Sequence, residues 1–413
     1  MKVEHVDVII IGAGPAGAVA GAMLANLNHK VLIIEKEHFP RFSIGESLLP
    51  QCMAFIKQAG LLENIETSAD DLAFQFKNGA AFFHQDKYTD FDFTEKFTPG
   101  PGTTYQIKRA GFDKLLADGA KQKGVDIRYG ELVKKVDVEC DNPTVDIQTD
   151  TGEEYQVTGK FLLDASGFGR VLPRLLQLET PSNFPVRQSY FTHVKDNITD
   201  KNFDRNKILI TVHPNYKDIW YWLIPFADGT ASVGVVGEPS MFDQQLTANQ
   251  LLQSFIEQTP NLKHLLNNAS FISDARVIKG YAANVDCLYG DNYALLGNAG
   301  EFLDPVFSSG VTIAMKSASL IAPVVDKKIN GKRVDIENEF AVPLKKGIDC
   351  FKTFVSAWYD GRFQDVIFFE QQEPHVKAMI SSILAGYAWD DNNPYVVQSE
   401  RRLNVLVKLC NDI

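Results

Sequence analysis

The sequence lacks several features that would assign a protein to a class at once. Its five cysteines form no C-x-x-C pair and have no metal-ligand spacing: Cys52, Cys140, Cys287, Cys350 and Cys410. Scattered cysteines are typical of reduced, buried thiols, and they predict no metal site. No apolar run is long enough to span a bilayer, and no cationic segment precedes a cleavable apolar one. We therefore expect a cytoplasmic protein without a membrane span.

Basic residues are also in the minority, and the net charge of the 413 residues is −11. A nucleic-acid-binding protein would carry a basic face, so no nucleic-acid partner is expected. The chain contains no internal repeat and no low-complexity tract. It is too long for one compact core, and two or three subdomains are expected.

What the sequence does contain is a dinucleotide-binding pattern near its start. A predicted strand over 8–11 leads into Gly12-Ala13-Gly14-Pro15-Ala16-Gly17, a G-x-G-x-x-G pattern, and into a helix of small residues over 18–27. A second predicted strand over 31–34 ends at Glu35. In such a unit the glycines allow a tight turn, close approach to a pyrophosphate and helix–strand packing. The helix N-terminus favours phosphate, and the acid accepts hydrogen bonds from ribose.

The position of this pattern favours FAD over a nicotinamide dinucleotide. The unit begins within the first ten residues, as is common in FAD proteins, and no second copy follows. An enzyme with its own NAD(P)H domain would normally show one. Any nicotinamide is therefore expected to bind transiently or to another protein.

Other polar and small residues are predicted to contact the cofactor. Arg41 and Ser43 lie on a loop that can return to the pyrophosphate, although Arg41 could instead pair with a surface carboxylate. Arg109 precedes a helix expected over 114–123, and a helix beginning near 311 can present its N-terminus to a flavin ring. The predicted cofactor-binding residues are Gly12, Gly14, Pro15, Ala16, Gly17, Glu35, Lys36, Arg41, Ser43, Arg109, Asp164, Ala165, Gly297, Asn298, Asp304, Pro305, Ser309, Gly310 and Val311.

The chain is expected to alternate between two layers. The fold class is α/β, a Rossmann-type FAD-binding domain with a β-rich (α+β) substrate domain and a helical C-terminal region. The predicted parts are FAD-binding segments at 1–72, 101–184 and 276–330, substrate-domain strands at 73–100, a β-rich substrate domain at 185–275 and helices at 331–413. The aromatic strands over 74–97 and 186–225 are expected to form an apolar pocket for a flat ring.

Three further motifs resemble those of one family. Trp220 to Pro225 reads WYWLIP and fits W-x-W-x-I-P, and Phe302 to Gly310 fits F-x-x-P-x-x-S-x-G. Lys77 stands in a K-x-G-A-x-F setting about 60 residues after the glycine loop. Together with the fingerprint, these motifs resemble the flavin-dependent halogenases, in particular their phenol and pyrrole branch. That family lies within the wider class of geranylgeranyl reductases and aromatic hydroxylases. The likeness covers residues 1 to about 330.

The resemblance implies a reaction and roles for four residues. A separate flavin reductase would supply reduced FAD, which with oxygen and a halide ion gives hypohalous acid. Lys77 would receive that acid and pass it to a small electron-rich aromatic, a phenol or pyrrole that is free or tethered to a carrier protein. Ser308 would help to bind the halide, while Trp220 and Trp222 would keep the substrate away from the flavin.

Two departures and several alternatives stay open. Asn298 replaces an aspartate common in the wider class, and no counterpart of the late glutamate of tryptophan halogenases is found. Taken alone, Lys77 could be a solvated lysine, the two tryptophans half-buried aromatics, and Ser308 part of a helix cap. The enzyme could also be a non-halogenating reductase or monooxygenase, or the chain an idle FAD-binding module.

Overall fold

The first layer of the molecule is a parallel sheet that carries the glycine loop. The computed structural model describes residues 3–182, 184–280 and 283–411. Its five-stranded sheet has the order β21-β12-β2-β3-β8, and all four pairings are parallel. The strands are β2 (Val8–Ile11), β3 (Val31–Glu35), β8 (Asp126–Tyr129), β12 (Phe161–Asp164) and β21 (Tyr293–Leu295). The apolar runs of β2, β3 and β12 are buried, as both faces of the sheet are covered.

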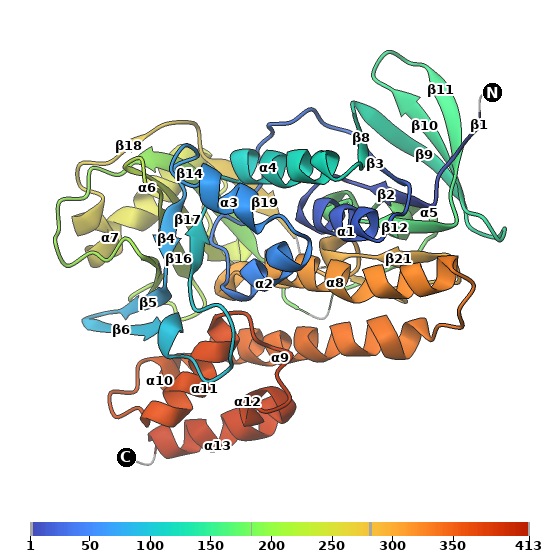
Figure 1. Cartoon of the computed structure of the whole chain (residues 1–413). Helices are drawn as coiled ribbons and strands as arrows, with labels where there is room; N and C mark the ends of the chain where they lie inside the picture. Colours follow the sequence, from blue (N-terminus) through green and yellow to red (C-terminus); the bar gives the residue numbers. More distant parts are fainter. Residues whose placement is uncertain (1–2, 183, 281–282, 412–413) are drawn as a thin grey trace.

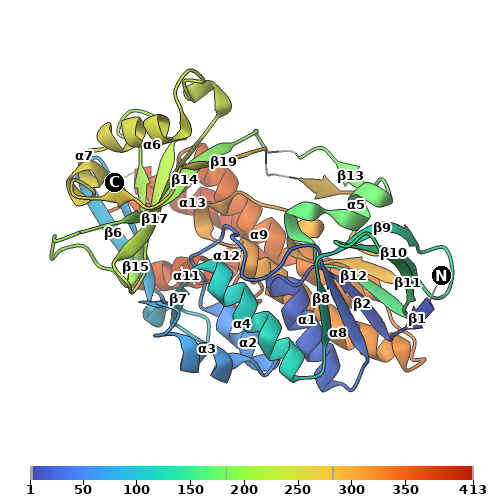
Figure 2. The same cartoon turned by 90° about the horizontal axis from the view of Figure 1, so that it is seen from above.

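Helices cover one face of this sheet and a small sheet covers the other (Figures 1 and 2). The helix α1 (Pro15–Asn26) packs against α4 (Arg109–Gln122) and α8 (Gly310–Ile329). On the opposite face lies a four-stranded sheet of order β1-β11-β10-β9. Its strands are β1 (Val3–His5), β9 (Glu131–Asp137), β10 (Thr144–Thr149) and β11 (Glu154–Thr158). The predicted Rossmann-type arrangement is confirmed.

The second layer is an eight-stranded mixed sheet, drawn at the left of Figure 1. Seven strands follow the order β18-β14-β17-β16-β15-β5-β6, and β19 pairs with β14. They are β5 (Gly79–His84), β6 (Lys87–Asp92), β14 (Gln188–Lys195), β15 (Lys207–Val212), β16 (Trp220–Pro225), β17 (Thr230–Gly237), β18 (Ser270–Phe271) and β19 (Arg276–Lys279). Only the β5–β15 pairing within this sheet is parallel, among the described strands.

The predicted β-rich segment also holds two helices, α6 (Ala248–Glu257) and α7 (Pro260–Leu265). Thr247 and Gln250 form a reciprocal capping box at the start of α6, which is a helix signal that can be read in the sequence. Leucines and Phe255 of these helices pack on one face of the large sheet. The boundaries of the predicted segments stay a prediction.

Short elements connect the two layers. The strands β4 (Gln75–Lys77) and β7 (Thr104–Gln106) form an antiparallel pair next to α2 (Gln51–Gln58) and α3 (Leu62–Ser68). Elsewhere lie α5 (Val171–Leu175) and the pair of β13 (Glu179–Thr180) with β20 (Asn284–Val285).

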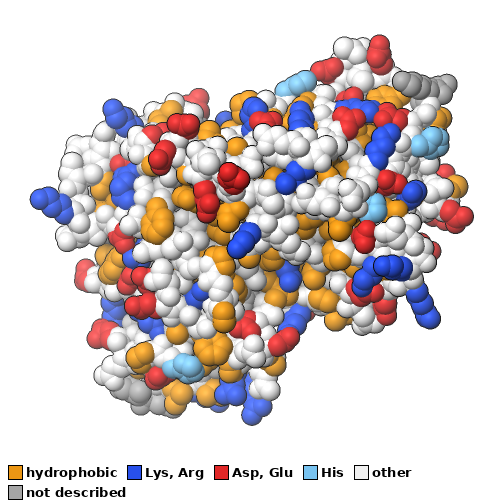
Figure 3. Space-filling model, in the orientation of Figure 1, with side chains coloured by type: hydrophobic (Ala, Val, Ile, Leu, Met, Phe, Trp, Pro, Cys, Tyr) orange, Lys and Arg blue, Asp and Glu red, His pale blue; other side chains and the backbone are white. Residues whose placement is uncertain are grey.

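The predicted helical C-terminal region is confirmed, and it lies beneath both layers in Figure 1. Its helices are α9 (Val342–Tyr359), α10 (Arg362–Ile367), α11 (Pro374–Leu384), α12 (Pro394–Val397) and α13 (Ser399–Asn411). Trp358 on α9 packs against Phe82 of β5, with ring centroids 5.9 Å apart. Within the described ranges no helix is long and apolar enough to cross a membrane. Figure 3 shows acidic and basic side chains interspersed over the viewed face.

Candidate functional site

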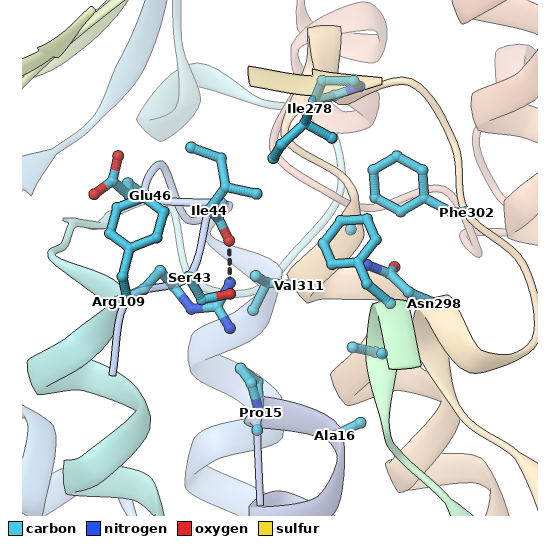
Figure 4. Close-up of a pocket in the computed structure, with 18 of the residues that line it drawn as sticks. Pro15, Ala16, Ser43, Ile44, Glu46, Arg109, Ile278, Asn298, Phe302 and Val311 are labelled. Carbon is cyan, nitrogen blue, oxygen red and sulfur yellow. Dashed lines mark hydrogen bonds between the residues drawn. The ribbon is translucent and has the colours of Figure 1, made fainter. Parts of the chain in front are cut away.

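A cavity of about 340 Å³ lies where the parallel strands end and the second layer begins. Figure 4 shows Pro15 and Ala16 at its floor, Arg109 and Glu46 on one side, and Phe302 on the other. Most of the predicted site residues line it: Gly12, Gly14, Pro15, Ala16, Glu35, Lys36, Arg41, Ser43, Arg109, Ala165, Trp220, Trp222, Asn298, Pro305, Ser308, Gly310 and Val311. Segments that lie nearly 300 residues apart in the sequence therefore meet in one cavity.

The other predicted residues lie behind its wall: Lys77, Gly17, Asp164, Gly297, Asp304 and Ser309 are not among the lining residues. The Asp164 carboxylate is fully buried and accepts hydrogen bonds from the backbone N–H groups of Ser166 and Leu172, at 2.8 and 2.7 Å. Asp304 likewise accepts from the backbone of Val306 at 3.1 Å. These carboxylates hold the turns that form the cavity, and direct contact with a cofactor stays a prediction.

Two helix N-termini face the cavity, and both suit an anionic group. The N-cap residues Gly14 of α1 and Ser309 of α8 make no side-chain capping bond, and neither first turn contains an acidic residue. The first N–H groups and the positive end of each helix dipole are thus available to a ligand. A Cβ atom built on Gly14 would meet only the Arg41 Nη2 atom, at 3.7 Å. The backbone here is open to a pyrophosphate, so these residues fit FAD.

Arginine side chains at the cavity are held in place by one buried carboxylate. Asp113 accepts hydrogen bonds from Arg109 at 2.7 and 2.9 Å and from Arg41 at 2.9 Å. Arg109 also donates to the carbonyl of Ile44, as the dashed line in Figure 4 shows. Arg41 therefore pairs with a buried carboxylate while it lines the cavity, and its Nε also lies 3.7 Å from the half-exposed carboxylate of Glu37, so the surface pairing considered above is present as well.

Asp113 was not identified in the sequence, although its spacing from Arg109 is an i,i+4 helix pair. The helix α4 begins at Arg109, five residues earlier than predicted. That start places both ends of the pair on one helix face. Glu35 lines the cavity as predicted, and its two carboxylate oxygens accept from the backbone N–H groups of Ala13 and Glu37 at 2.9 and 3.0 Å.

Lys77 is fully buried, so the alternative of a solvated lysine is wrong. Its Nζ donates to the Ser47 hydroxyl and to the Leu48 carbonyl, both at 2.8 Å, and lies 5.5 Å from the centroid of the Phe93 ring. Burial lowers the pKa of Lys77 to about 7, while the nearby Cys52 acts weakly in the other direction. Among these neighbours Ser47 lines the cavity, so the Ser47 hydroxyl lies between the Lys77 amine and the cavity.

The contact between Lys77 and Ser47 is fixed by the backbone. The segment 46–48 pairs with β7, through Ile107 N–H to the Glu46 carbonyl at 2.7 Å and Leu48 N–H to the Tyr105 carbonyl at 3.2 Å. Because β7 pairs in turn with β4, which carries Lys77, three segments form one small sheet-like platform. Sequence alone did not identify Ser47 or Glu46 because their importance depends on this long-range pairing.

Trp220 and Trp222 both line the cavity from β16, with ring centroids 5.9 Å apart. The Trp220 Nε1–H donates to the Tyr359 hydroxyl at 2.9 Å, and that of Trp222 donates to the Ser232 hydroxyl at 3.0 Å. Tyr359 is the last residue of α9, so the C-terminal region helps to position Trp220.

The expected aromatic pocket is only partly correct. The side chains of Ile208, Trp220, Trp222 and Ile224 form an apolar end of the cavity, as expected for the strands within 186–225. The aromatic residues of 74–97 do not line the cavity: Phe76 and Tyr88 are exposed, whereas Phe82, Phe91 and Phe93 are buried in the core. Phe82 packs against Trp358 of the C-terminal helix α9, a partner that was not evident in the sequence.

Comparisons with known proteins bear on this site. Residues 5–250 match the family model described as FAD binding domain. A relative from Pseudoalteromonas luteoviolacea, a brominase of 1H-pyrrole-2-carbonyl groups on a peptidyl-carrier protein, is 31% identical over 330 residues, covering 79% of this chain and 78% of that protein. The corresponding chlorinase of Pseudomonas fluorescens is 27% identical, with 99% of this chain and 93% of that protein covered. The crystal structure of a flavoprotein/dehydrogenase from Cytophaga hutchinsonii superposes with a TM-score of 0.94 at 40% identity, covering 99% of each chain.

Proposed function

Because this chain belongs to the flavin-dependent halogenases, a family of FAD-dependent oxidoreductases, we propose that it halogenates an electron-rich aromatic ring. Reduced FAD, when bound, supplies together with oxygen the oxidising power that turns a halide ion into hypohalous acid. The chain itself binds the halide, keeps the ring away from the flavin and holds the hypohalous acid beside Lys77.

The halide is assigned to the start of α8. Ser308 and Gly310 line the cavity there, and the first turn of the helix has no side-chain cap. Ser308 has a φ of +56°, a left-handed conformation that is rare outside glycine and that is often found at functional sites. The uncapped N–H groups and the helix dipole together favour a small anion.

The ring is kept apart from the flavin by the two tryptophans. Trp220 and Trp222 stand side by side in the cavity wall, and each indole N–H has a hydrogen-bond partner that holds its ring in place. A Cβ atom on Gly234 would come within 2.3 Å of the Trp222 ring, so the strand below that ring must carry glycine. Two large, fixed rings form a barrier that a flexible side chain would not.

The observation that carries the proposal is the position of Lys77. An ammonium group buried without a carboxylate partner among the described residues is costly, and it is held 2.8 Å from a hydroxyl in the cavity wall. Lysines in such surroundings are commonly functional because burial adjusts their protonation. We assign Lys77 the role of receiving hypohalous acid past Ser47 and directing its halogen to the ring.

The substrate we propose is a phenol or a pyrrole, either free or tethered to a carrier protein. The two related halogenases act on a pyrrole-2-carbonyl group on a carrier, and this cavity has an apolar end of suitable character. We further propose that a separate flavin reductase supplies reduced FAD, since the sequence holds one G-x-G-x-x-G unit and no second copy of it.

Aerobic turnover tests this function. The enzyme is given FAD, a general flavin reductase, NADH and bromide or chloride, together with phenols, pyrroles and indoles, free and carrier-bound. We expect a product with the halogen isotope pattern in its mass spectrum. A product that is hydroxylated or reduced and carries no halogen would contradict the proposal.

A non-halogenating reductase or monooxygenase is the second candidate. The flavoprotein/dehydrogenase from Cytophaga hutchinsonii shares 40% identity with this chain. In addition, Lys77 is packed in the core beside Phe93 and does not itself line the cavity. NAD(P)H oxidation coupled to alkene reduction, independent of halide, would favour this candidate.

The pH dependence of the reaction follows from the pKa of Lys77, which burial lowers to about 7. Its ammonium form prevails below that pH and can donate a hydrogen bond to the oxygen of hypohalous acid. We expect halogenation to slow as the pH rises through about 7, with Lys77→Met showing no such step. A rate that instead rises through this pH would mean that the neutral amine is the reactive form.

The stability of the folded protein should have the opposite pH dependence: it should increase as the pH rises, whereas the halogenation rate falls. In the unfolded chain Lys77 regains its ordinary pKa of 10.5, so between about 7 and 10.5 the unfolded state binds more protons. The free energy of unfolding should therefore rise with pH in this window, by up to about 1.4 kcal/mol per pH unit. Urea unfolding at pH 7 and pH 9 measures the change, and Lys77→Met should remove this contribution.

A further inference from the structure

A carboxylate lies directly beside the residue that contacts Lys77. Glu46 precedes Ser47 on the loop between β3 and α2, and both line the cavity. The side chain of Glu46 is only 1% exposed. One of its oxygens, Oε1, lies 2.7 Å from His193 Nε2, whereas Oε2 is enclosed and has no hydrogen-bond partner in the described structure. Buried polar atoms nearly always have partners, so this arrangement needs a functional explanation.

His193 connects this carboxylate to the outside. It stands on β14 with 22% of its side chain exposed, and its ring lies near those of Phe42 and Phe226, at centroid distances of 6.1 and 5.4 Å. The glutamate and the histidine thus form a hydrogen-bonded path from the cavity wall to solvent. Histidine is suited to such a path because it gains and loses a proton near neutral pH.

The other acids of the cavity are already engaged. Both oxygens of Glu35 accept hydrogen bonds from backbone N–H groups. Glu37 is about half exposed and lies near Lys36 and Arg41. Among the described acids that line the cavity, Glu46 is the buried one with an unpartnered oxygen.

We propose that Glu46 is the catalytic base that removes the ring proton during halogenation, and that His193 is a positioning residue that passes this proton to solvent. This inference rests on the proposed function. The ring carbon bonds to halogen as the halogen–oxygen bond of hypohalous acid breaks. The ring C–H bond then breaks, its electron pair returns to the ring, and the proton goes to the Glu46 carboxylate. The released hydroxide takes a proton from the Lys77 ammonium and leaves as water, and solvent restores the proton on Lys77.

The test uses the full-length FAD-loaded enzyme with bromide and an equal mixture of unlabelled and ring-deuterated phenol. In wild type, proton loss is fast and bromophenol forms equally from both. In Glu46→Gln, which keeps the shape of the side chain, we expect about 100-fold less bromophenol. Its residual product should favour the unlabelled ring, because breaking the C–H bond has become limiting.

Two additional measurements separate this role from a structural one. Formate, a small carboxylate, should restore bromophenol formation to Glu46→Ala, and an FAD titration should show that both variants still bind the cofactor. The matched control is Asp200→Asn. Asp200 also pairs with a histidine, His264, at 3.3 Å, but this pair lies on the surface and does not line the cavity. We expect that variant to behave like wild type.

The possible results distinguish this inference from the proposed function. A β-diketone trap for hypobromous acid reports the earlier step. Undiminished trapping with strongly reduced, isotope-selective bromophenol formation in Glu46→Gln, and full bromophenol formation in wild type, supports the assignment. Undiminished bromophenol without isotope discrimination in Glu46→Gln overturns it and leaves the proposed function standing. Wild type that traps hypobromous acid but makes no bromophenol also overturns it, and wild type that yields neither overturns both.

Discussion

Replacing Lys77 by methionine should reduce ring halogenation by at least about 100-fold while leaving FAD binding and trapped hypohalous acid at wild-type levels. Methionine keeps an apolar stem against Phe93 and removes only the nitrogen that contacts the Ser47 hydroxyl and the Leu48 carbonyl. The loss thus reports the amine and not the packing. Mass spectrometry of the ring product and trapping of the hypohalous acid are measured on the same reaction.

A partly buried lysine, Lys316, provides the control for this substitution. Lys316 on α8 lies over the rings of Phe55 and Trp389, and burial lowers its pKa as well, but it does not line the cavity. Lys316→Met should keep full activity. Equal halogenation by both variants would show that Lys77 has no part in the chemistry, and loss of FAD binding in Lys77→Met would show that its role is structural.

Replacing two glycines of the G-x-G-x-x-G pattern by alanine should affect different properties: Gly17→Ala should lower stability, and Gly14→Ala should weaken FAD binding. A Cβ atom on Gly17 would lie 1.9 Å from the Gly12 carbonyl oxygen, and this backbone atom cannot move away without breaking the turn. A Cβ atom on Gly14 meets nothing closer than 3.7 Å. We expect Gly17→Ala to lose more than about 3 kcal/mol of stability. Gly14→Ala should keep its stability and bind FAD at least about tenfold more weakly, because the methyl group occupies the place of the pyrophosphate.

Urea unfolding of the cofactor-free protein and FAD titration by flavin fluorescence measure the two effects separately. Gly21→Ala is a useful reference, because it lies on the same helix and its nearest contact is a side-chain atom of Ile33 at 2.9 Å. That neighbour can rotate, so a smaller loss of stability is expected than for Gly17. Wild-type FAD affinity in Gly14→Ala would contradict the assignment of the pyrophosphate to this turn.

The parts of the fold that the sequence predicted well are those that depend on neighbours in the chain. The strand–glycine–helix unit around Gly12 is local, and its apolar runs and small residues determine β2, α1 and β3. The W-x-W-x-I-P and F-x-x-P-x-x-S-x-G motifs likewise placed Trp220 and Ser308 at one cavity.

What could not be predicted depends on contacts between distant segments. The burial of Lys77 results from the pairing of β4 with β7 and of β7 with the segment 46–48, so a three-residue strand gave no sign of it. The parallel pairing of β5 with β15 joins residues more than 120 positions apart. The packing of Phe82 against Trp358 required the C-terminal helices to be in place.

The strand order of the parallel sheet also determines how early this protein can fold during its synthesis. Strand β2 is complete at Ile11, but the sheet gains its last strand only with β21 at residues 293–295, and α1 is covered only when α8 follows. A ribosome that adds 5–20 residues per second needs roughly 15 to 60 seconds to cover that interval. During this time the glycine loop has already been synthesised, but the later segments that complete the cavity are still missing. A fragment cut after residue 250, where the match to the FAD binding domain ends, would remain in that incomplete state.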